Sequence, residues 1–589
     1  MHAAPESNWL PAFSKAPLAL GLALALGAAL PWSPASARSI DAGALPAVRD
    51  ALRFGDQPAA LDRQLRQRGF AAPAVPNRPA GVVPVTNCDD SGAGSLRDAV
   101  TNAVSGDVID LSALTCSTIT LESGLVSTVD ELTLTGPGAS QLAIDGNNAV
   151  RVFEHQVQNP GSGMLTVEGL TIRNGSYVYS GPGVYGGLAP GACILSQSSV
   201  TLTSVTIDHC SASGWSVFGA AIDTLGALYM TDSSVTGTTA IADATDISAT
   251  IYGGAVYTKA GYITRSVIDG ATVSATSVAA FSGMLGGGIF GFYGVVLDQS
   301  RVSNVVAHVA AAKISYAKGA GVGTPNTVIM TGSTVSGNEV HGTPGIGPSG
   351  AYTYTSAIGG GGVYVMAIPR GSVPASSITG STISGNAAIV DGEPGAYTVG
   401  GGGALGTWAA KVLAIANSTI SGNAADIRGG GIYTRNRGAL ALVNTTVTDN
   451  TSPEGAGIAD AADGSAYPFT VTSTIVAGNH VPAGSTSQDI VTVHAIDGSH
   501  DLIGSANVAV PADTIGGDPR LAPLADNGGP TPTHALLPDS PAVDTGSNPS
   551  DLATDQRGGS YVRSAGAAPD IGAFELQAAP DAIFADGFE

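Results

Sequence analysis

One serine-threonine motif recurs along this chain, for example as STISGN after both GGGVYVMAIPRGSVPASSITG and GGGALGTWAAKVLAIAN. Ten copies align on their last apolar residue, here called the register position, at intervals of 27 to 48 residues. Repeats of this length are typical of solenoid proteins, in which each repeat packs on its neighbours. The register positions are Ile172, Ile207, Val235, Ile268, Val302, Val335, Ile383, Ile420, Val447 and Val476.

The residues before each register position keep fixed offsets. In VLAIANSTI, Leu413 and Ile415 alternate with small residues, Asn417 follows, and Ile420 is the register position. The same offsets recur in LALVNTTV, LTVEGLTI and FTVTSTIV. Alternation with period 2 predicts short strands with every second side chain inward. We expect the chain to turn a corner at the position of Asn417. The residue there is small or polar because its side chain must fit inside the coil.

Glycine runs form a second recurring motif, separate from the serine-threonine motif. GGAV, GGGI, GAGV, GGGV, GGGI and GAGI lead into apolar residues some way before the next serine-threonine motif. Glycine accepts positive φ and lets stacked backbones approach closely. A flexible linker is excluded, because each run ends in an apolar residue at a fixed place. Those residues are Val256, Ile289, Val322, Val363, Ile432 and Ile458.

Asparagine closes five of the motifs, three residues after the register position. An amide in this slot can bond the same amide one repeat above or below. The second copy has Cys210 in the slot, which indicates a local disulfide in place of the ladder. The predicted ladder consists of Asn338, Asn386, Asn423, Asn450 and Asn479.

These patterns predict an all-β chain of stacked parallel strands. Two-residue hairpin turns and a 3.6-residue period are both missing, which excludes hairpin sandwiches and helical repeats. The variable spacing places insertions as loops on one side of the solenoid. An open solenoid end exposes unpaired backbone groups, so we expect the segments 81–135 and 489–575 to cap the two ends.

The composition bears on location and partners. A net charge of −22 excludes a phosphate-backbone reader such as a nucleic-acid-binding protein. Lys15, the apolar run APLALGLALALGAALPW and a small-residue ASA site predict a cleaved signal peptide, with a retained anchor as the alternative. No later stretch is long and apolar enough to cross a membrane. Export permits disulfides, and closeness in sequence favours Cys88–Cys116 and Cys193–Cys210, with free thiols as the alternative.

Several stretches resemble known families. The repeats look like the right-handed parallel β-helix of the pectin-lyase-like superfamily and are similar to repeats of chlamydial polymorphic outer-membrane proteins. The stretch GGDPRLAPLADNGGPTPTHALLPDSPAVDTG, with TDQRG, PDIGAFE and the early VTNCDDSGAGSLRDAV, resembles the choice-of-anchor Q family of exported bacterial proteins. The superfamily resemblance implies a right-handed parallel β-helix. The ten motif copies predict about ten or more coils, capped at both ends, and the spacing in LPAVRDALRFGDQPAALDRQLRQRGF predicts a short N-terminal helical arm. The resemblances imply no particular activity.

The motifs and resemblances above predict how the chain is divided into segments. The final DAIFADGFE resembles short tails of exported proteins, and an accidental tail is the alternative. The segments are a signal peptide (1–37), a helical arm with a Pro-rich linker (38–80), an N-terminal cap with the first coils (81–135), parallel β-helix repeats (136–488), a choice-of-anchor Q-like region (489–576) and a C-terminal tail (577–589).

Acidic residues near the C-terminus are candidate calcium ligands, because carboxylates and amides suit that ion. The alternative is that they form turns, since Asp-Asn-Gly-Gly and similar stretches are common turn formers. No other cofactor is expected. The candidates are Asp526, Asn527, Asp544, Asp555 and Asp570.

Two functions from different classes remain open. We expect a monomeric structural or adhesive protein, secreted or on the outer cell surface, that binds an extracellular glycan or a surface protein. The alternative is a polysaccharide lyase or glycoside hydrolase, and hydrolysis needs two carboxylates across the scissile bond. Asp208 and Asp232 are the weak candidates for that pair, and no catalytic residue is otherwise predicted. The local cluster of Arg428, Arg435 and Arg437 is either a small anion site or a solvated loop.

Overall fold

The structure is a computed structural model, and it describes most of the chain from Ala80 to Gln577. The predicted signal peptide and helical arm lie outside the described residues, apart from Ala80, and so does the tail after Gln577. In the described part, no helix is long and apolar enough to span a bilayer. The internal residues left out are 158–161, 180–186, 246–247, 279–280, 313, 344–355, 367–374, 393–397, 409–411, 436–437, 462–466, 484 and 486.

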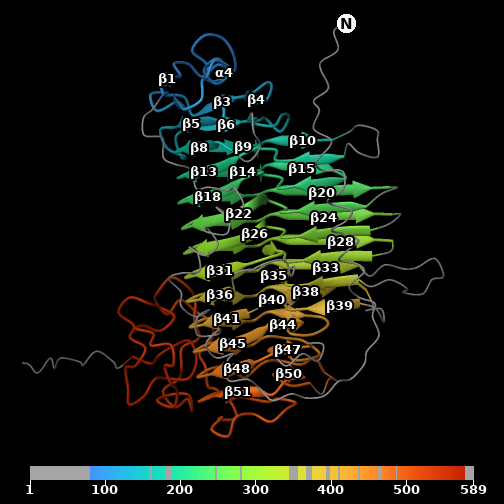
Figure 1. Ribbon diagram of the computed structural model, residues 1–589, viewed down its shortest axis with the longest axis vertical. Coiled ribbons are helices and arrows are strands. Elements are labelled where there is room, and N and C mark those ends of the chain that lie inside the picture. The colour runs from blue at the N-terminus through green and yellow to red at the C-terminus, as the bar shows by residue number, and fades with distance from the viewer. Residues whose placement is uncertain are drawn as a thin grey trace, which may run out of the picture.

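The chain winds into a right-handed parallel β-helix, as predicted, and successive coils pair strand on strand (Figure 1). One coil shows the path: β17 (Ile222–Thr224) and β18 (Ala227–Thr231) lie in sheet A, and β19 (Ser234–Thr236) lies in sheet B. β20 (Thr239–Ala244) and β21 (Ala249–Tyr252) then lie in sheets C and D before the next coil begins. The side chains that point inward form one continuous apolar core.

Sheet A contains two strips of strands joined at a bend, here called the elbow, which β22 (Val256–Thr264) and β26 (Ile289–Asp298) cross without a break. The other strands of the first strip are β4 (Leu125–Ser127), β7 (Phe153–His155), β12 (Ile194–Ser196), β17, β30 (Val322–Thr324), β35 (Val363–Met366), β40 (Leu405–Trp408), β44 (Ile432–Arg435), β47 (Ile458–Asp460) and β50 (Ile490–Thr492). Those of the second are β1 (Val82–Pro84), β2 (Asp107–Asp110), β5 (Glu131–Thr135), β8 (Met164–Glu168), β13 (Ser199–Thr203), β18, β31 (Val328–Thr331), β36 (Ser376–Thr379), β41 (Val412–Ala416), β45 (Ala439–Val443), β48 (Phe469–Thr472) and β51 (Ile496–Ser499).

Sheet B contains all ten register positions. They pair one on the next from Ile172 to Val476, and each is buried, Ile383 and Ile420 included. The predicted register is therefore confirmed. Its strands are β3 (Thr118–Thr120), β6 (Ala143–Asp145), β9 (Thr171–Arg173), β14 (Thr206–Asp208), β19, β23 (Val267–Asp269), β27 (Arg301–Ser303), β32 (Thr334–Ser336), β37 (Thr382–Ser384), β42 (Thr419–Ser421), β46 (Thr446–Thr448), β49 (Ile475–Val476) and β52 (Leu502–Ile503).

The corners before sheet B differ from the expectation that their side chains fit inside. Asp232, Arg265 and Gln299 occupy corners with φ of 51°, 45° and 48°, and the side chains of Arg265 and Gln299 are exposed. The shared property is the left-handed backbone conformation, for which Gly and Asn are the usual residues. Backbone conformation, rather than space inside the coil, therefore selects the corner residue.

Much of the variable length between motifs is strand, and not loop as predicted. Sheets C and D extend the middle coils into a two-layer wing, seen at the right of Figure 1. Small buried residues, Ala242 and Ala244 from β20 and Ala249 from β21, fill the space between the layers. Sheet C contains β10 (Ser176–Val178), β15 (Ser211–Gly214), β20, β24 (Thr272–Ser277), β28 (Val306–Ala311), β33 (Glu339–Thr343), β38 (Ala387–Val390) and β43 (Ala424–Ala425). Sheet D contains β11 (Leu188–Pro190), β16 (Ser216–Phe218), β21, β25 (Phe281–Leu285), β29 (Ile314–Lys318), β34 (Ser356–Gly359) and β39 (Thr398–Gly401).

The N-terminal end of the core is covered by a short helix, α4 (Leu96–Thr101). Ser95 is its N-cap and accepts the backbone N–H of Asp98 at 3.1 Å. Leu96, Ala99 and Val100 are buried against the first coils. This end is therefore capped within the predicted segment 81–135.

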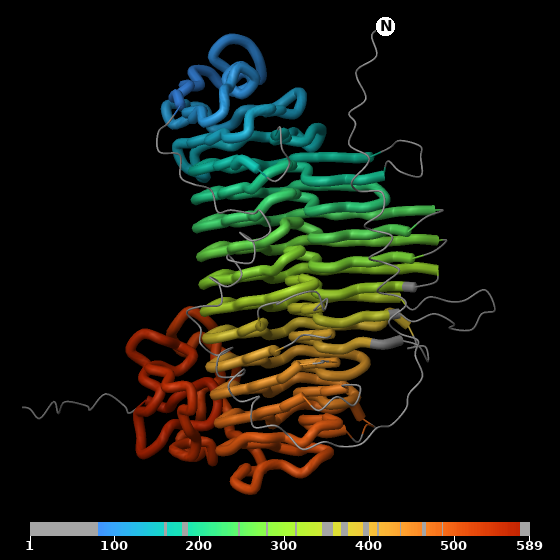
Figure 2. The backbone as a smooth tube through the Cα atoms, in the orientation of Figure 1, coloured from blue at the N-terminus to red at the C-terminus, as the bar shows by residue number. Residues whose placement is uncertain are grey.

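Most of the C-terminal segment lies along the flank of the β-helix, and within the predicted cap 489–575 only the stretch 504–515 lies over the last strands and packs on the end of the core. Residues 489–503 still form coil strands β50, β51 and β52, so the β-helix extends beyond residue 488. The chain then returns beside the last coils (Figure 2). There Leu536, Ile571 and Phe574 pack on Ile475 and Leu502, the outward-facing residues of sheet B. An apolar outer face on these strands is thus covered by the chain's own C-terminal segment.

Ladders of side chains form hydrogen bonds with backbone N–H and C=O groups inside the coils. The structure places the five asparagines one above another, and Asn423 donates to Oδ1 of Asn450 at 2.8 Å. Asn479 continues the row to Oδ1 of Asp489 at 2.9 Å. Both predicted disulfides, Cys88–Cys116 and Cys193–Cys210, are confirmed.

A second ladder uses the first serine of the motif, which the sequence reasoning missed. The backbone N–H of Ser266 donates to Oγ of Ser300 at 3.1 Å, and that of Ser300 donates to Oγ of Ser333 at 3.0 Å. Each hydroxyl in turn donates to the carbonyl two residues earlier. The recurrence of serine at one place in the repeat was the available signal.

Candidate functional site

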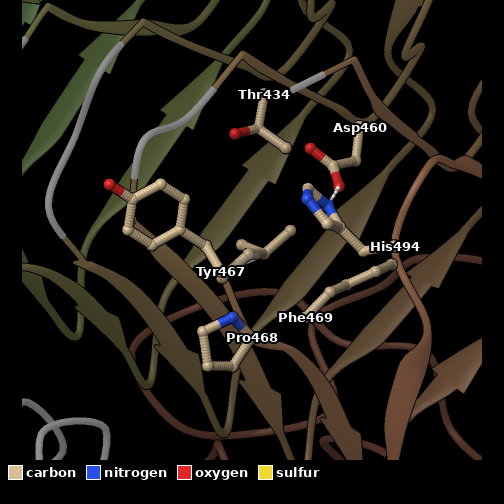
Figure 3. Close-up of a pocket in the computed structure, with 8 residues that line it drawn as sticks. Thr434, Asp460, Tyr467, Pro468, Phe469 and His494 are labelled. Carbon is tan, nitrogen blue, oxygen red and sulfur yellow. Dashed lines mark hydrogen bonds and ion pairs between the residues drawn. The ribbon is translucent and has the colours of Figure 1, made fainter. Parts of the chain in front are cut away.

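A pocket opens at the elbow of the last coils. Eight residues separate Asp460, the last residue of β47, from Phe469, the first of β48, whereas two separate Thr224 from Ala227 in an earlier coil. The pocket is lined by Thr434, Gly438, Leu440, Asp460, Tyr467, Pro468, Phe469 and His494 (Figure 3). Among the lining residues, Thr434, Leu440, Asp460 and Phe469 are themselves buried.

The Asp460–His494 pair is the polar centre of this pocket. Nδ1 of His494 lies 2.6 Å from Oδ2 of Asp460, which also accepts the Thr492 hydroxyl at 3.0 Å. Asp460 is buried, and the ring of Tyr467 lies across the pocket from the pair (Figure 3). A carboxylate on one imidazole nitrogen fixes the tautomer and orientation of the ring, as in general acid-base pairs. Sequence reasoning missed these residues, because 34 positions separate them.

A second cluster of ionisable groups lies on the outward face of sheet A. Asp223 is the middle residue of β17, flanked by the inward-facing Ile222 and Thr224. Burial raises the pKa of the Asp223 carboxyl to about 8, and the charges of Lys259 and Arg151 act in the opposite direction. Its Oδ1 has no hydrogen-bond partner among the residues that the structure describes. Burial therefore favours the protonated form of this carboxyl.

Lys259 and Arg151 supply cations to the Asp223 cluster. Burial lowers the pKa of the Lys259 ammonium, while Asp223 partly offsets this shift. Arg151 pairs with Glu154 at 2.9 Å and lies 4.2 Å from the centre of the Tyr177 ring. Titratable groups with shifted pKa values and specific charge partners are typical of functional sites.

Glu154 and Asp223 are carboxyl groups on the same row of the first strip. Glu154 pairs with Leu195, which pairs with Asp223, so the two acids are two coils apart. With about 4.8 Å per coil, their Cα atoms are about 9.6 Å apart. The row thus places two carboxyl-bearing residues two coils apart, with Asp223 buried and Glu154 paired with Arg151.

An aromatic patch lies across the elbow from Asp223, on the second strip. The rings of Tyr229 and Tyr262, paired in register, stack 5.1 Å apart at an interplanar angle of 6°. Both rings are partly buried against Ala227, Ala260 and Val296, and Tyr293 packs on the same group. We call Tyr229, Tyr262 and Tyr293 the tyrosine patch. It presents aromatic surface in the same coils as Asp223 and Lys259.

A buried cation lies between sheets D and A. Lys318, at the end of β29, is 2% exposed, and its Nζ donates to the Tyr364 hydroxyl at 2.6 Å. The rings of Tyr316, Tyr364 and Trp408 surround Nζ at 4.3, 4.3 and 5.0 Å. Burial, with the charge of Arg435, holds the pKa of Lys318 well below its ordinary value. Such a position serves packing and is closed to a large substrate.

The predicted catalytic pair is not brought together. Asp208 ends β14, accepts the Thr236 hydroxyl at 2.6 Å and lies 2.7 Å from His209. Asp232 lies at the corner before β19, where the hydrogen-bonded Arg265 guanidinium lowers the pKa of its carboxyl. The pairing of Thr206 with Ser234 puts the two acids at opposite ends of these strands. Asp208 and Asp232 therefore do not form the predicted catalytic pair.

The calcium candidates are distributed through the C-terminal segment. Asp526 accepts the Gly528 N–H in a turn, and Asp544 accepts the Ala568 N–H. Asp555 pairs with Arg557 at 2.6 Å, and Asp570 accepts the N–H groups of Asp544 and Leu576. Asn527 donates to the Thr533 carbonyl. Within the described residues these carboxylates form no group of three whose oxygens converge.

The arginine cluster is only partly described. Arg428 pairs with Glu454 at 3.4 Å, and Arg435 lies 5.1 Å from the Trp408 ring centre. Arg437 lies outside the described residues. The two described guanidinium groups thus have an acidic and an aromatic neighbour.

The chain was compared with known families, curated proteins and solved structures. No protein-family model and no curated protein matches the sequence. The crystal structure of pectate lyase Pel9A matches over 85% of this chain and 97% of that chain, at 11% identity and a TM-score of 0.27. The activity of that enzyme is not transferred on similarity of this degree, and the fold assignment here depends on the strand pairing.

Proposed function

We propose that this protein acts outside the cytoplasm, secreted or on the outer cell surface, as a monomeric β-helix that binds a glycan on sheet A. Two buried or partly buried disulfides suit an oxidising compartment. The resemblance of residues 516–576 to the choice-of-anchor Q family supports export. A surface protein is the other partner class, and the binding test below distinguishes it.

The observation that carries the proposal is the Tyr229–Tyr262 stack. Tyrosine combines a flat apolar ring with a hydroxyl and is enriched at binding surfaces for that reason. Strand pairing holds the two rings parallel before any ligand binds, which reduces the entropy lost on binding. Because the two rings stack on each other, the apolar face of a sugar ring can lie against their exposed edges while its hydroxyls remain in water. The net charge of −22 opposes a polyanion, so the expected ligand is a neutral glycan.

Affinity electrophoresis of the purified protein in gels containing neutral glycans tests the proposal. Tyr229→Ala and Tyr262→Ala should each abolish retardation, because each removes one half of the stack. Ile241→Ala, which removes an exposed apolar residue of sheet C, is the matched control and should migrate as the parent. Parent migration unchanged across a panel of neutral glycans, or retained binding in both tyrosine variants, would contradict glycan binding at this patch.

A glycoside hydrolase is the second candidate, and the Glu154–Asp223 row specifically favours it. In that case Asp223, whose protonated form burial favours, donates a proton to the leaving oxygen, and Glu154 activates water. A lyase would instead use Lys259 as the base. Release of reducing sugar that is lost in Asp223→Asn, with gel retardation preserved, identifies the hydrolase. Binding without any product in the parent leaves the adhesive function.

A further inference from the structure

We propose that His308, His341 and Asp391 bind a divalent transition metal, with Zn²⁺ as the ion that this donor set suits. The site lies on the outward face of sheet C, in the wing, and is separate from the glycan surface proposed on sheet A. Nitrogen and carboxylate oxygen donors in this combination are typical of Zn²⁺.

Strand pairing brings the three residues together. His308 of β28 pairs directly with His341 of β33, and their ring centroids are 4.4 Å apart. Asp391 directly follows β38, the next strand of the sheet, and its Oδ1 lies 3.1 Å from Nδ1 of His341. One ligand atom from each residue lies within 4.8 Å of the others. Three consecutive coils thus contribute one donor each.

The geometry is within reach of a metal centre. Tetrahedral bonds of about 2.0–2.1 Å separate ligand atoms by about 3.3 Å. His308 and Asp391 are exposed and His341 is half-buried, so small side-chain rotations close the remaining distance without moving the strands. A fourth position faces solvent and is available to water.

A second observation points to the same ligand. When Nδ1 of His341 faces the metal, its Nε2 faces Oε2 of Glu339 at 3.4 Å. Histidines that bind metals commonly donate their other ring N–H to a carboxylate, which fixes the tautomer and increases ligand basicity. Glu339 is therefore a positioning residue for His341. A bound metal would cross-link three coils of the wing.

Isothermal titration calorimetry tests the site, with ZnCl₂ added to EDTA-dialysed, untagged protein. We expect saturable binding that weakens at least tenfold in His308→Ala, His341→Ala and Asp391→Ala, and up to tenfold in Glu339→Gln. His500→Ala is the matched control, because His500 and Asp513 form an exposed pair without a second histidine in their group. Its affinity should equal that of the parent.

Thermal unfolding followed by circular dichroism gives a second readout and checks that each variant folds. Zn²⁺ should raise the midpoint of the parent and of His500→Ala, and leave that of His308→Ala unchanged. Equal Zn²⁺ affinity in parent and His308→Ala, or no binding by the parent at micromolar Zn²⁺, would overturn the proposal.

Discussion

The side-chain amide of Asn386 donates to Oδ1 of Asn423 at 2.9 Å, and the backbone N–H of Asn386 donates to the same oxygen at 3.0 Å. The amide of Asn386 also reaches the Val335 carbonyl one coil earlier, at 3.0 Å. One buried side chain therefore joins three coils. The stability of the β-helix should depend on this ladder.

Asn386→Ala should lower the free energy of unfolding by about 2–4 kcal/mol. The truncation leaves buried partners of the amide unsatisfied, including the Asn338 N–H that donates to it. Guanidinium denaturation followed by circular dichroism measures the change. Asn304→Gly removes an exposed amide of a neighbouring motif position and should cost less than about 1 kcal/mol. An equal decrease in the free energy of unfolding in the two variants would show that the ladder stabilises the fold no more than an exposed amide does.

Asp223→Asn should stabilise the protein increasingly as pH rises from 5 to 9. The folded-state pKa of Asp223 is raised to about 8, so folding favours its protonated form. Its contribution to stability is complete at low pH and is lost as pH rises through the range between about 4 and 8, at up to about 1.4 kcal/mol per unit. Denaturation midpoints at several pH values measure this. Asp243→Asn, at an exposed position of β20, should keep the parent's slope. If the denaturation midpoint of Asp223→Asn changes with pH as steeply as that of the parent, Asp223 is not a buried acid with a raised pKa.

Lys318→Met combined with Tyr364→Phe should stabilise the protein at neutral pH by about 1–3 kcal/mol, since it removes a buried amine together with the tyrosine hydroxyl that accepts its hydrogen bond. Because burial lowers the folded-state pKa of Lys318, the unfolded chain binds its proton more tightly. The parent should therefore gain stability as pH rises toward the ordinary lysine pKa, and the double variant should lack this gain. Thermal unfolding of the parent and of the double variant between pH 7 and 10 measures this difference. Destabilisation of the double variant at every pH would mean that the aromatic cage outweighs the burial cost.

Gln556→Ala should loosen the C-terminal segment from the flank of the coils. The Gln556 amide donates to Oγ1 of Thr382 at 2.8 Å, and its carbonyl accepts the Thr419 hydroxyl at 2.6 Å. Losing these buried bonds should cost about 1–3 kcal/mol. Limited proteolysis should then cut within residues 516–576 faster, while the coils remain intact. Asn548→Ala, which removes an amide bonded only within its own turn to Leu552, should be cleaved like the parent. Unchanged cleavage of Gln556→Ala contradicts this role.

Much of the coil was predictable from local periodicity. The offsets around Ile383 and Ile420 specify inward positions, because a strand alternates its side chains with period 2 and each coil repeats the pattern. The asparagine slot follows from the same alignment, since equal places in successive repeats stack, whereas the pairing of Cys193 with Cys210 was predicted from their closeness in sequence. The pair His308 and His341 could have been found in this way, as both lie six residues after a register position.

Only the tertiary structure decided the sites. Glu154 and Asp223 share a row because strand pairing aligns both with Leu195, and Asp460 meets His494 because its strand pairs with the strand that ends two residues before His494. Burial of Asp223 and Lys318 depends on which segments cover them, and a repeat pattern does not encode this. The docking of Gln556 on Thr382 joins residues 174 positions apart. Periodicity reports which way a side chain points within its own coil, whereas contacts between unlike segments depend on shape complementarity that exists only after the coils have stacked.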